Sequence, residues 1–277
     1  MSVLKVNYVK TNPSKNTTIL ILDAFPRAQY ADIAKKIMRP EVAYAEQVGF
    51  IERPTLSGAE CRLHMMGDEF CANAAASLGA YLAYKRNMRE MQPYNFTLEV
   101  SGQEKNLACV VTLDHEIYHV KIELPIPSRI CESQVEYKNT LIYYGIVRYS
   151  GISHIVIRGE KFDNESKKLL KYVLHRHIEK ENIPAIGSTL FSEEQKRIMP
   201  LVYVDKLGTE IWENSCGTAS ASVAAYIAHL SASNVEIDLI QPSGYRIQAS
   251  AVYKKNCLNT LTITENVSIT TEGIAFV

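Results

Sequence analysis

Apolar and polar positions follow two different periods along this chain of 277 residues. Residues 5–10 and 17–23 alternate or run apolar around a turn-rich segment, which predicts a strand, a loop and a second strand. Residues 28–38 place apolar side chains at helical spacing and stop before Pro40, which predicts a helix. Further strands are predicted by the same patterns at 48–52, 61–66, 95–100, 107–113, 201–204, 235–240 and 245–252.

Two runs are apolar on nearly every side and also match each other. Residues 71–83 read Cys-Ala-Asn-Ala-Ala-Ala-Ser-Leu-Gly-Ala-Tyr-Leu-Ala, and residues 216–228 read Cys-Gly-Thr-Ala-Ser-Ala-Ser-Val-Ala-Ala-Tyr-Ile-Ala. A helix that is apolar all round is buried, so each run predicts a central helix that begins just after a cysteine. The strand and turn order after each helix is also repeated, which indicates a duplicated fold unit.

The duplication predicts an α/β (α+β) protein of two similar halves. We place the first half at residues 1–125 and the second at 126–264, with the boundary at the proline pair of Pro125-Ile126-Pro127. An additional amphipathic helix is predicted at 166–179, between the two repeated helices.

Composition narrows the class of protein. Thirty basic and thirty acidic residues cancel, so no overall field favours nucleic acid or an anionic membrane. No apolar run approaches the roughly 18 residues of a membrane helix, and the first residues alternate like a strand instead of forming a signal peptide. Six cysteines are too few for a disulfide framework in a chain of this length, so we expect reduced thiols and a cytoplasmic protein.

The repeated cysteines carry the candidate chemistry. A helix start offers unpaired N–H groups and a positive dipole end, which are expected to lower the pKa of the Cys71 and Cys216 thiols and to hold a carboxylate. Two such starts across a cleft would grip an amino acid's α-carboxylate and place one sulfur on each face of its Cα. The four other cysteines have no repeated context and are expected to be structural: Cys61, Cys109, Cys131 and Cys257.

Several motifs resemble diaminopimelate epimerase and its cofactor-independent racemase relatives, and more closely the histidine racemases of opine-metallophore (staphylopine-type) pathways. They are Asn12-Pro13-Ser14 with Asn16-Thr17-Thr18, Glu46-Gln47-Val48-Gly49-Phe50, Gly67-Asp68-Glu69-Phe70-Cys71-Ala72-Asn73, Ile211-Trp212-Glu213-Asn214-Ser215-Cys216-Gly217 and Gln241-Pro242-Ser243-Gly244. The resemblance implies a mostly antiparallel sheet around a central helix in each half, with the active site between them. It also implies that the C-terminal strand, residues 265–277, returns to the first half.

The resemblance further implies a set of site residues. Cys71 and Cys216 would form the acid/base pair of a racemase that needs no pyridoxal cofactor and no metal. The other implied residues are the backbone N–H groups of Ala72, Asn73, Gly217 and Thr218 on the substrate carboxylate, and the amide side chains of Asn16 and Gln47 in the pocket. The family usually has glycine where this chain has Ala72, and the extra methyl group tightens the site.

Other departures count against diaminopimelate, which stays an alternative substrate beside proline. The chain lacks the Glu-Arg-Gly stretch that binds a distal carboxylate, and Met65, Ile152 and Gly187 stand where the family's asparagines align. A buried carboxylate without partners is costly, so a smaller or cationic side chain is favoured. We therefore predict L/D-histidine racemisation, with Glu46 or Glu213 meeting the imidazole.

The alternatives differ in substrate or in class. A proline or hydroxyproline racemase would use the same two thiols, whereas isomerases of the phenazine-biosynthesis type share the fold without this cysteine pair. A non-catalytic amino-acid-binding module is the alternative outside enzymes. The family resemblance also implies a homodimer, and D-histidine as a product for metallophore biosynthesis.

Two histidine motifs are expected not to bind metal. His115-Glu116-Ile117-Tyr118-His119 matches the zinc-protease pattern, which requires a helix, but its surroundings alternate like a hairpin. His175-Arg176-His177 lies near the end of a charged helix and is interpreted as a solvated face.

Overall fold

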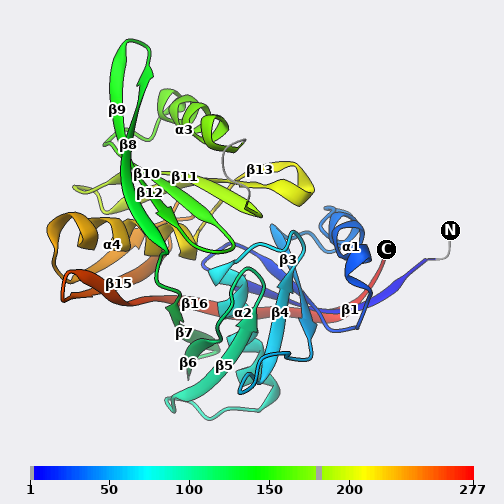
Figure 1. Ribbon diagram of the computed structural model, residues 1–277. Helices are drawn as coiled ribbons and strands as arrows, with labels where there is room; N and C mark the ends of the chain where they lie inside the picture. Colours follow the sequence, from blue (N-terminus) through cyan, green and yellow to red (C-terminus); the bar gives the residue numbers. More distant parts are fainter. Residues whose placement is uncertain (1–2, 179–182) are drawn as a thin grey trace.

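The computed structural model describes residues 3–178 and 183–277, which form a sheet-rich α+β protein (Figure 1). The helices are η1 (Arg27–Gln29), α1 (Tyr30–Ile37), α2 (Ala72–Lys85), α3 (Asn164–Ile178), η2 (Asp205–Leu207) and α4 (Gly217–Ser231). The strands are β1 (Lys5–Pro13), β2 (Thr18–Ile21), β3 (Gln47–Glu52), β4 (Cys61–Met65), β5 (Tyr94–Val100), β6 (Leu107–Asp114), β7 (Ile117–Leu124), β8 (Arg129–Tyr137), β9 (Thr140–Arg148), β10 (Ser153–Arg158), β11 (Ala185–Ser192), β12 (Arg197–Val204), β13 (Thr209–Trp212), β14 (Val235–Ile240), β15 (Arg246–Lys254) and β16 (Cys257–Phe276).

The N-terminal half is a closed sheet around α2. Its strands follow the order β1-β2-β3-β4-β5-β6-β7-β16, and the additional pairing of β1 with β16 closes the ring. Helix α2 contacts strands all around this ring and is buried along most of its length, which explains why its sequence has no polar face.

The C-terminal half wraps in the same way around α4. Its strands continue from β16 in the order β15-β14-β12-β11-β10-β9-β8, with β13 paired to β12. The long β8–β9 hairpin extends beyond the sheet at the top of Figure 1. Most strand pairs in both halves are antiparallel, and the α+β class with a sheet around a central helix is confirmed.

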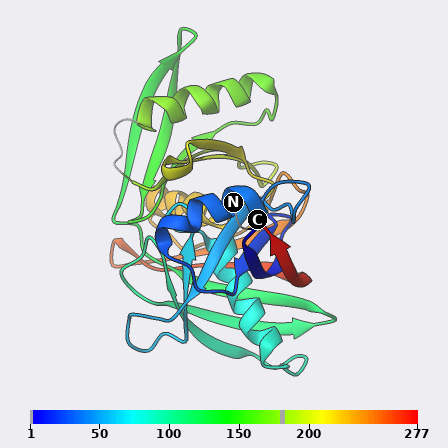
Figure 2. The ribbon, with the colours of Figure 1, turned by 90° about the vertical axis from the view of Figure 1, so that its right-hand side faces the viewer.

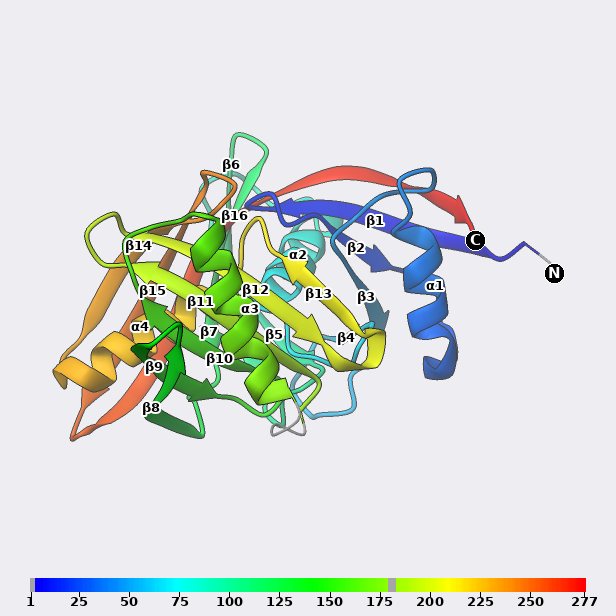
Figure 3. The ribbon, with the colours of Figure 1, turned by 90° about the horizontal axis from the view of Figure 1, so that it is seen from above.

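A second helix covers the outer face of each half. In β2 the side chains of Ile19 and Ile21 pack with α1, whereas Leu20 between them packs with α2. In β10, Ile155 and Ile157 likewise face α3 while Val156 faces α4. Figures 2 and 3 show α3 on the opposite side of the sheet from α4. Because both faces of these strands are buried, residues 19–21 and 155–157 are apolar at every position and do not alternate.

Strand β16 belongs to both sheets. Its first part pairs with β15, its middle with β7, and its last part, residues 267–276, with β1. A single continuous strand thus runs from one half into the other (Figure 1).

Most predicted elements are present at their predicted places. The predicted helix at 166–179 is α3, and its last residue, Glu179, lies outside the described residues. The zinc-protease pattern lies on the β6–β7 hairpin: His115 is in the turn and His119 in β7. The interpretation of residues 175–177 as a solvated face is wrong for His177, which is buried and hydrogen-bonded to the Tyr144 hydroxyl at 2.9 Å because α3 turns that side toward its sheet.

Within residues 3–178 and 183–277, no helix has both the length and the apolar character needed to cross a membrane. All six cysteines are free thiols.

Candidate active site

Cys71 and Cys216 occupy equivalent positions at the starts of α2 and α4. Each is the N-cap residue in an extended conformation, with φ of −130° and −142° respectively. The Cys71 sulfur accepts a hydrogen bond from the Ala74 N–H at 3.5 Å, as an N-cap side chain does. Because the two helices contact each other at the centre of the molecule, both cysteines lie at the junction of the two halves.

One small cavity lies between the two cysteines. It is about 30 Å³ in volume, which is room for one or two water molecules and not for an amino acid. Its lining comprises Glu46, Gln47, Met66, Glu69, Phe70, Cys71, Ile152, Val202, Val204, Ile211, Glu213, Cys216 and Thr218. The residues come from both halves, so room for a substrate has to open at the junction of the halves, and the form described here is a closed one.

Two predicted site residues join the halves and do not line this cavity. The Asn73 side chain accepts a hydrogen bond from the Gly217 N–H at 2.7 Å and donates to the Ser215 hydroxyl at 3.2 Å. The Asn16 amide donates to the Ser215 carbonyl at 2.7 Å. These bonds hold the starts of α2 and α4 together in the closed form.

The contact between the two helix starts explains the alanine at position 72. A Cβ atom on Gly217 would lie 3.0 Å from the Ala72 methyl carbon and 2.7 Å from Ile263 Cδ1. The Ala72 methyl group thus fits against the glycine at position 217.

The predicted carboxylate-binding N–H groups differ in availability. Ala72, Asn73 and Thr218 are first-turn residues, whose N–H groups have no helical carbonyl to bind. The Gly217 N–H is occupied by the Asn73 side-chain oxygen. An incoming carboxylate must displace that oxygen before it can use all four groups.

The Cys71 thiol faces an amide. It donates to Gln47 Oε1 at 2.9 Å, and the other end of the same amide donates to the Thr18 hydroxyl at 2.7 Å. Because the Thr18 hydroxyl fixes the amide orientation, Gln47 presents its oxygen to the sulfur.

The Cys216 thiol faces a carboxylate and a hydroxyl. It is 3% exposed, lies beside the Glu213 carboxyl group, and is 3.4 Å from the Thr218 hydroxyl. Thr218 is also 3.0 Å from Nε2 of His154, a fully buried histidine whose Nδ1 has no hydrogen-bond partner. Burial lowers the pKa of His154 to about 3, so its ring is neutral.

Both thiols are less acidic than the helix starts alone predicted. Burial raises the pKa of Cys71 and of Cys216 well above the ordinary value, and the nearby Glu213 carboxylate raises it further in both cases. The expectation of a lowered thiol pKa is therefore wrong for the closed form, because desolvation and negative neighbours outweigh the helix dipole.

Three carboxyl groups line the cavity, one more than predicted. Burial raises the pKa of Glu213 to about 8 and that of Glu69 to about 7, and it also raises the pKa of Glu46. Glu46 hydrogen-bonds the Asn214 amide of the opposite half. One buried oxygen each of Glu46 and Glu213 has no hydrogen-bond partner.

Sequence reasoning missed Glu69, His154 and the hydroxyl role of Thr218. Glu69 lies two positions before Cys71 in a polar turn, which was the available signal. His154 sits in an apolar strand far along the chain from either cysteine, and nothing local distinguishes it from a structural core histidine.

The fold of this chain is one that solved structures of racemases and epimerases also have. Its structure resembles that of a hydroxyproline epimerase from Agrobacterium vitis with a TM-score of 0.72 at 11% identity, covering 99% of this chain and 93% of that one. At that identity the likeness concerns the fold.

Sequence comparison then identifies the family. The family model described as "Histidine racemase CntK N-terminal domain" matches residues 5–276. A histidine racemase from Fusobacterium nucleatum subsp. nucleatum is 30% identical over 247 residues, 87% of each chain, and one from Staphylococcus aureus is 28% identical over 222 residues, 80% of this chain and 79% of that one. The chain belongs to the histidine racemase family.

Proposed function

We propose that this protein interconverts L- and D-histidine by proton transfer between two cysteines at Cα, without pyridoxal phosphate. The observation that carries the proposal is the position of Cys71 and Cys216 at the starts of two central helices, lining one cavity. Family membership supports the reaction and the substrate. A proline-type racemase fits less well, because three carboxyl groups line the cavity.

Substrate binding begins with separation of the halves, since the closed cavity is smaller than histidine. The substrate carboxylate would then replace the Asn73 oxygen at Gly217 and bind the first-turn N–H groups of Ala72, Asn73 and Thr218. Glu46 and Glu213, each with an unpaired oxygen, would meet the cationic groups of the substrate.

The proton transfer uses both faces of Cα. In one direction the Cys216 thiol gives its proton to the Glu213 carboxylate, and the resulting thiolate removes the α-proton. The electron pair left on Cα is stabilised by delocalisation into the carboxylate, which the helix N–H groups hold. The Cys71 thiol donates its proton to the opposite face, and the reverse direction exchanges the two roles.

The family resemblance also supports three statements about the protein's setting. We propose that it acts in the cytoplasm, as a homodimer, and that its D-histidine is used in metallophore biosynthesis. Light scattering on the purified protein would measure the assembly, and a monomer at micromolar concentration would contradict the dimer.

The test is proton NMR of L-histidine in D₂O with the reduced protein, beside other L-amino acids and diaminopimelate. Loss of the histidine α-proton signal with formation of D-histidine is the expected result. Cys71→Ser and Cys216→Ser should each abolish racemisation, and wild-type turnover by either variant would contradict the two-thiol mechanism. Exchange on another amino acid alone would change the substrate, and no exchange across the panel would favour the binding module.

A further inference from the structure

The turn before Cys71 directs one carboxylate into the cavity. Glu69 is 5% exposed and lines the cavity, and it accepts a hydrogen bond from the Gly67 N–H at 2.8 Å. Among the described residues that line the cavity, none is lysine, arginine or histidine. A cation or N–H donor of the substrate would therefore meet carboxylates without competition from a protein cation.

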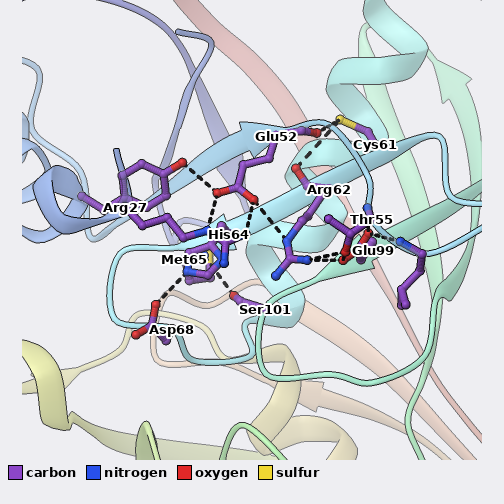
Figure 4. A network of polar contacts seen from close by, with 12 residues as sticks. Arg27, Glu52, Thr55, Cys61, Arg62, His64, Met65, Asp68, Glu99 and Ser101 are labelled. Atoms are coloured by element: carbon purple, nitrogen blue, oxygen red, sulfur yellow. Dashed lines mark hydrogen bonds and ion pairs between the residues drawn. The ribbon is translucent and has the colours of Figure 1, made fainter. Parts of the chain in front are cut away.

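The turn that carries Glu69 is fixed by hydrogen bonds on several sides. The Ser101 hydroxyl donates to the Glu69 carbonyl at 2.7 Å and accepts from the Met65 N–H at 3.0 Å. Asp68, with φ of 65°, does not line the cavity and pairs with His64 at 2.7 Å (Figure 4). It also pairs with Lys206 of the other half at 2.9 Å. The turn thus directs two adjacent carboxylates to different places: Asp68 faces the surface and Glu69 faces the cavity.

The glycine at position 67 leaves room for the Glu69 carboxylate. A Cβ atom on Gly67 would lie 2.7 Å from Glu69 Oε2 and 2.5 Å from Val204 Cγ1. Both groups lie against the same glycine, so the Glu69 carboxylate stands beside an apolar wall of the cavity. That wall consists of Met66, Val202, Val204 and Ile211.

The other parts of the substrate would be held by other groups, so its side chain is the part that would contact this apolar wall. The two sulfurs fix Cα, the helix starts fix the carboxylate, and Glu213 lies against Cys216, close to the reacting carbon. An imidazole is a flat apolar ring with N–H groups on its edge, which matches an apolar wall with a carboxylate beside it.

We infer that Glu69 is a specificity-determining residue. Its carboxylate accepts a hydrogen bond from an N–H of the substrate's imidazole ring, which lies against the wall of Met66, Val202, Val204 and Ile211. This inference rests on the proposed histidine racemase function and adds a recognition residue to it. Glu46 remains available to the second ring nitrogen.

The test compares ligands with and without a ring N–H in wild type and in Glu69→Gln. Imidazole, as a competitive inhibitor of histidine exchange, should bind the variant about 10–100-fold more weakly, the loss expected when a charged hydrogen-bond acceptor is removed. The kcat/KM of α-proton exchange with L-histidine should fall by a similar factor. The kcat/KM of exchange with 3-(2-thienyl)-L-alanine, which has a five-membered ring without N–H, should change less than about threefold.

Asp68→Asn is the matched control, because it alters the neighbouring carboxylate of the same turn. It should leave the imidazole inhibition constant unchanged. Gly67→Ala, which displaces the Glu69 side chain without altering its charge, should weaken imidazole binding as Glu69→Gln does.

An unchanged imidazole inhibition constant in Glu69→Gln would overturn the inference, as would an equal loss of exchange with both amino acids. Failure of the proposed function is a separate result, since it would appear as absence of histidine exchange in the wild-type protein itself.

Discussion

The two cysteines occupy equivalent places in duplicated helices, yet their surroundings differ. Cys71 retains some exposure and its thiol faces the neutral amide of Gln47. Cys216 is buried and its thiol faces the Glu213 carboxylate, with Thr218 on its other side. Duplication has preserved the position of the sulfur and changed the group that could receive its proton.

This difference indicates how a symmetric scaffold supports two half-reactions. The Glu213 carboxyl group beside Cys216 can, in its ionised form, accept the thiol proton and so form the thiolate, whereas the Gln47 amide beside Cys71 can only orient the thiol. In the resting protein the two sulfurs are thus prepared for different roles, although racemisation requires each to act as donor and as acceptor in turn.

Replacing Glu213, the carboxyl group beside Cys216, should have the largest effect on catalysis. Glu213→Gln retains shape and hydrogen bonding but cannot accept the thiol proton, so kcat should fall by roughly 10²–10⁴-fold. Chiral chromatography of the histidine product measures this. Glu210→Gln, in the exposed pair with Lys171, is the control and should change kcat less than about twofold. Wild-type kcat in Glu213→Gln would mean that the asymmetry has no catalytic role.

Separating the two helix starts should have the next largest effect. In Gly217→Ala the new methyl group meets Ile263 and Ala72, which pushes the sulfurs apart, and kcat/KM should fall by about 10–100-fold. Gly273→Ala is the control, since the nearest atom to its Cβ is 3.9 Å away. Equal activity of the two variants would show that the spacing of the helix starts is not critical.

The corresponding change on the Cys71 side should be smaller. Gln47→Leu removes a neutral hydrogen bond to the thiol, and kcat should fall by about 5–10-fold. The measurement is the same chiral assay, run in parallel with Glu213→Gln. A larger loss in Gln47→Leu than in Glu213→Gln would reverse the assignment of roles.

The buried carboxyl of Glu213 also makes stability depend on pH. Its pKa is raised from 4.5 to about 8 by burial, so between these values the folded state holds more protons than the unfolded state. Stability then decreases as pH rises from about 5 to 8. We expect the Tm of the free protein to fall by a few degrees over this range, and the fall to be smaller in Glu213→Gln. Identical slopes in differential scanning calorimetry would contradict the raised pKa.

The smallest effect is expected at the surface ion pair between the halves. Lys206→Ala removes the 2.9 Å contact with Asp68, and because exposed pairs contribute roughly 0–1 kcal/mol, KM should rise less than about fivefold. High salt should reproduce the rise in wild type. Lys138→Ala, whose partner Glu165 lies in the same half, is the control.

The sequence predicts the scaffold better than the site. The repeated Cys helices and the strand patterns depend on local periodicity, so α2, α4 and most strands lie where predicted. The arrangement of the site depends on contacts between residues that are far apart in the sequence. The Asn73 side chain binds the Gly217 N–H, and His154 contacts Thr218 from another element. The thiol pKa was predicted in the wrong direction, because burial between two halves cannot be read from a helix start alone.

The path of β16 has a consequence for synthesis on the ribosome. Residues 267–276 close the ring of strands by pairing with β1, which is made first. The N-terminal half therefore cannot complete its core until almost the whole chain has left the ribosome, even though it is the first half to emerge. Until then, the early strands have an unpaired edge. Because contacts so distant in sequence form slowly, we expect the nascent chain to fold slowly and to need protection by chaperones.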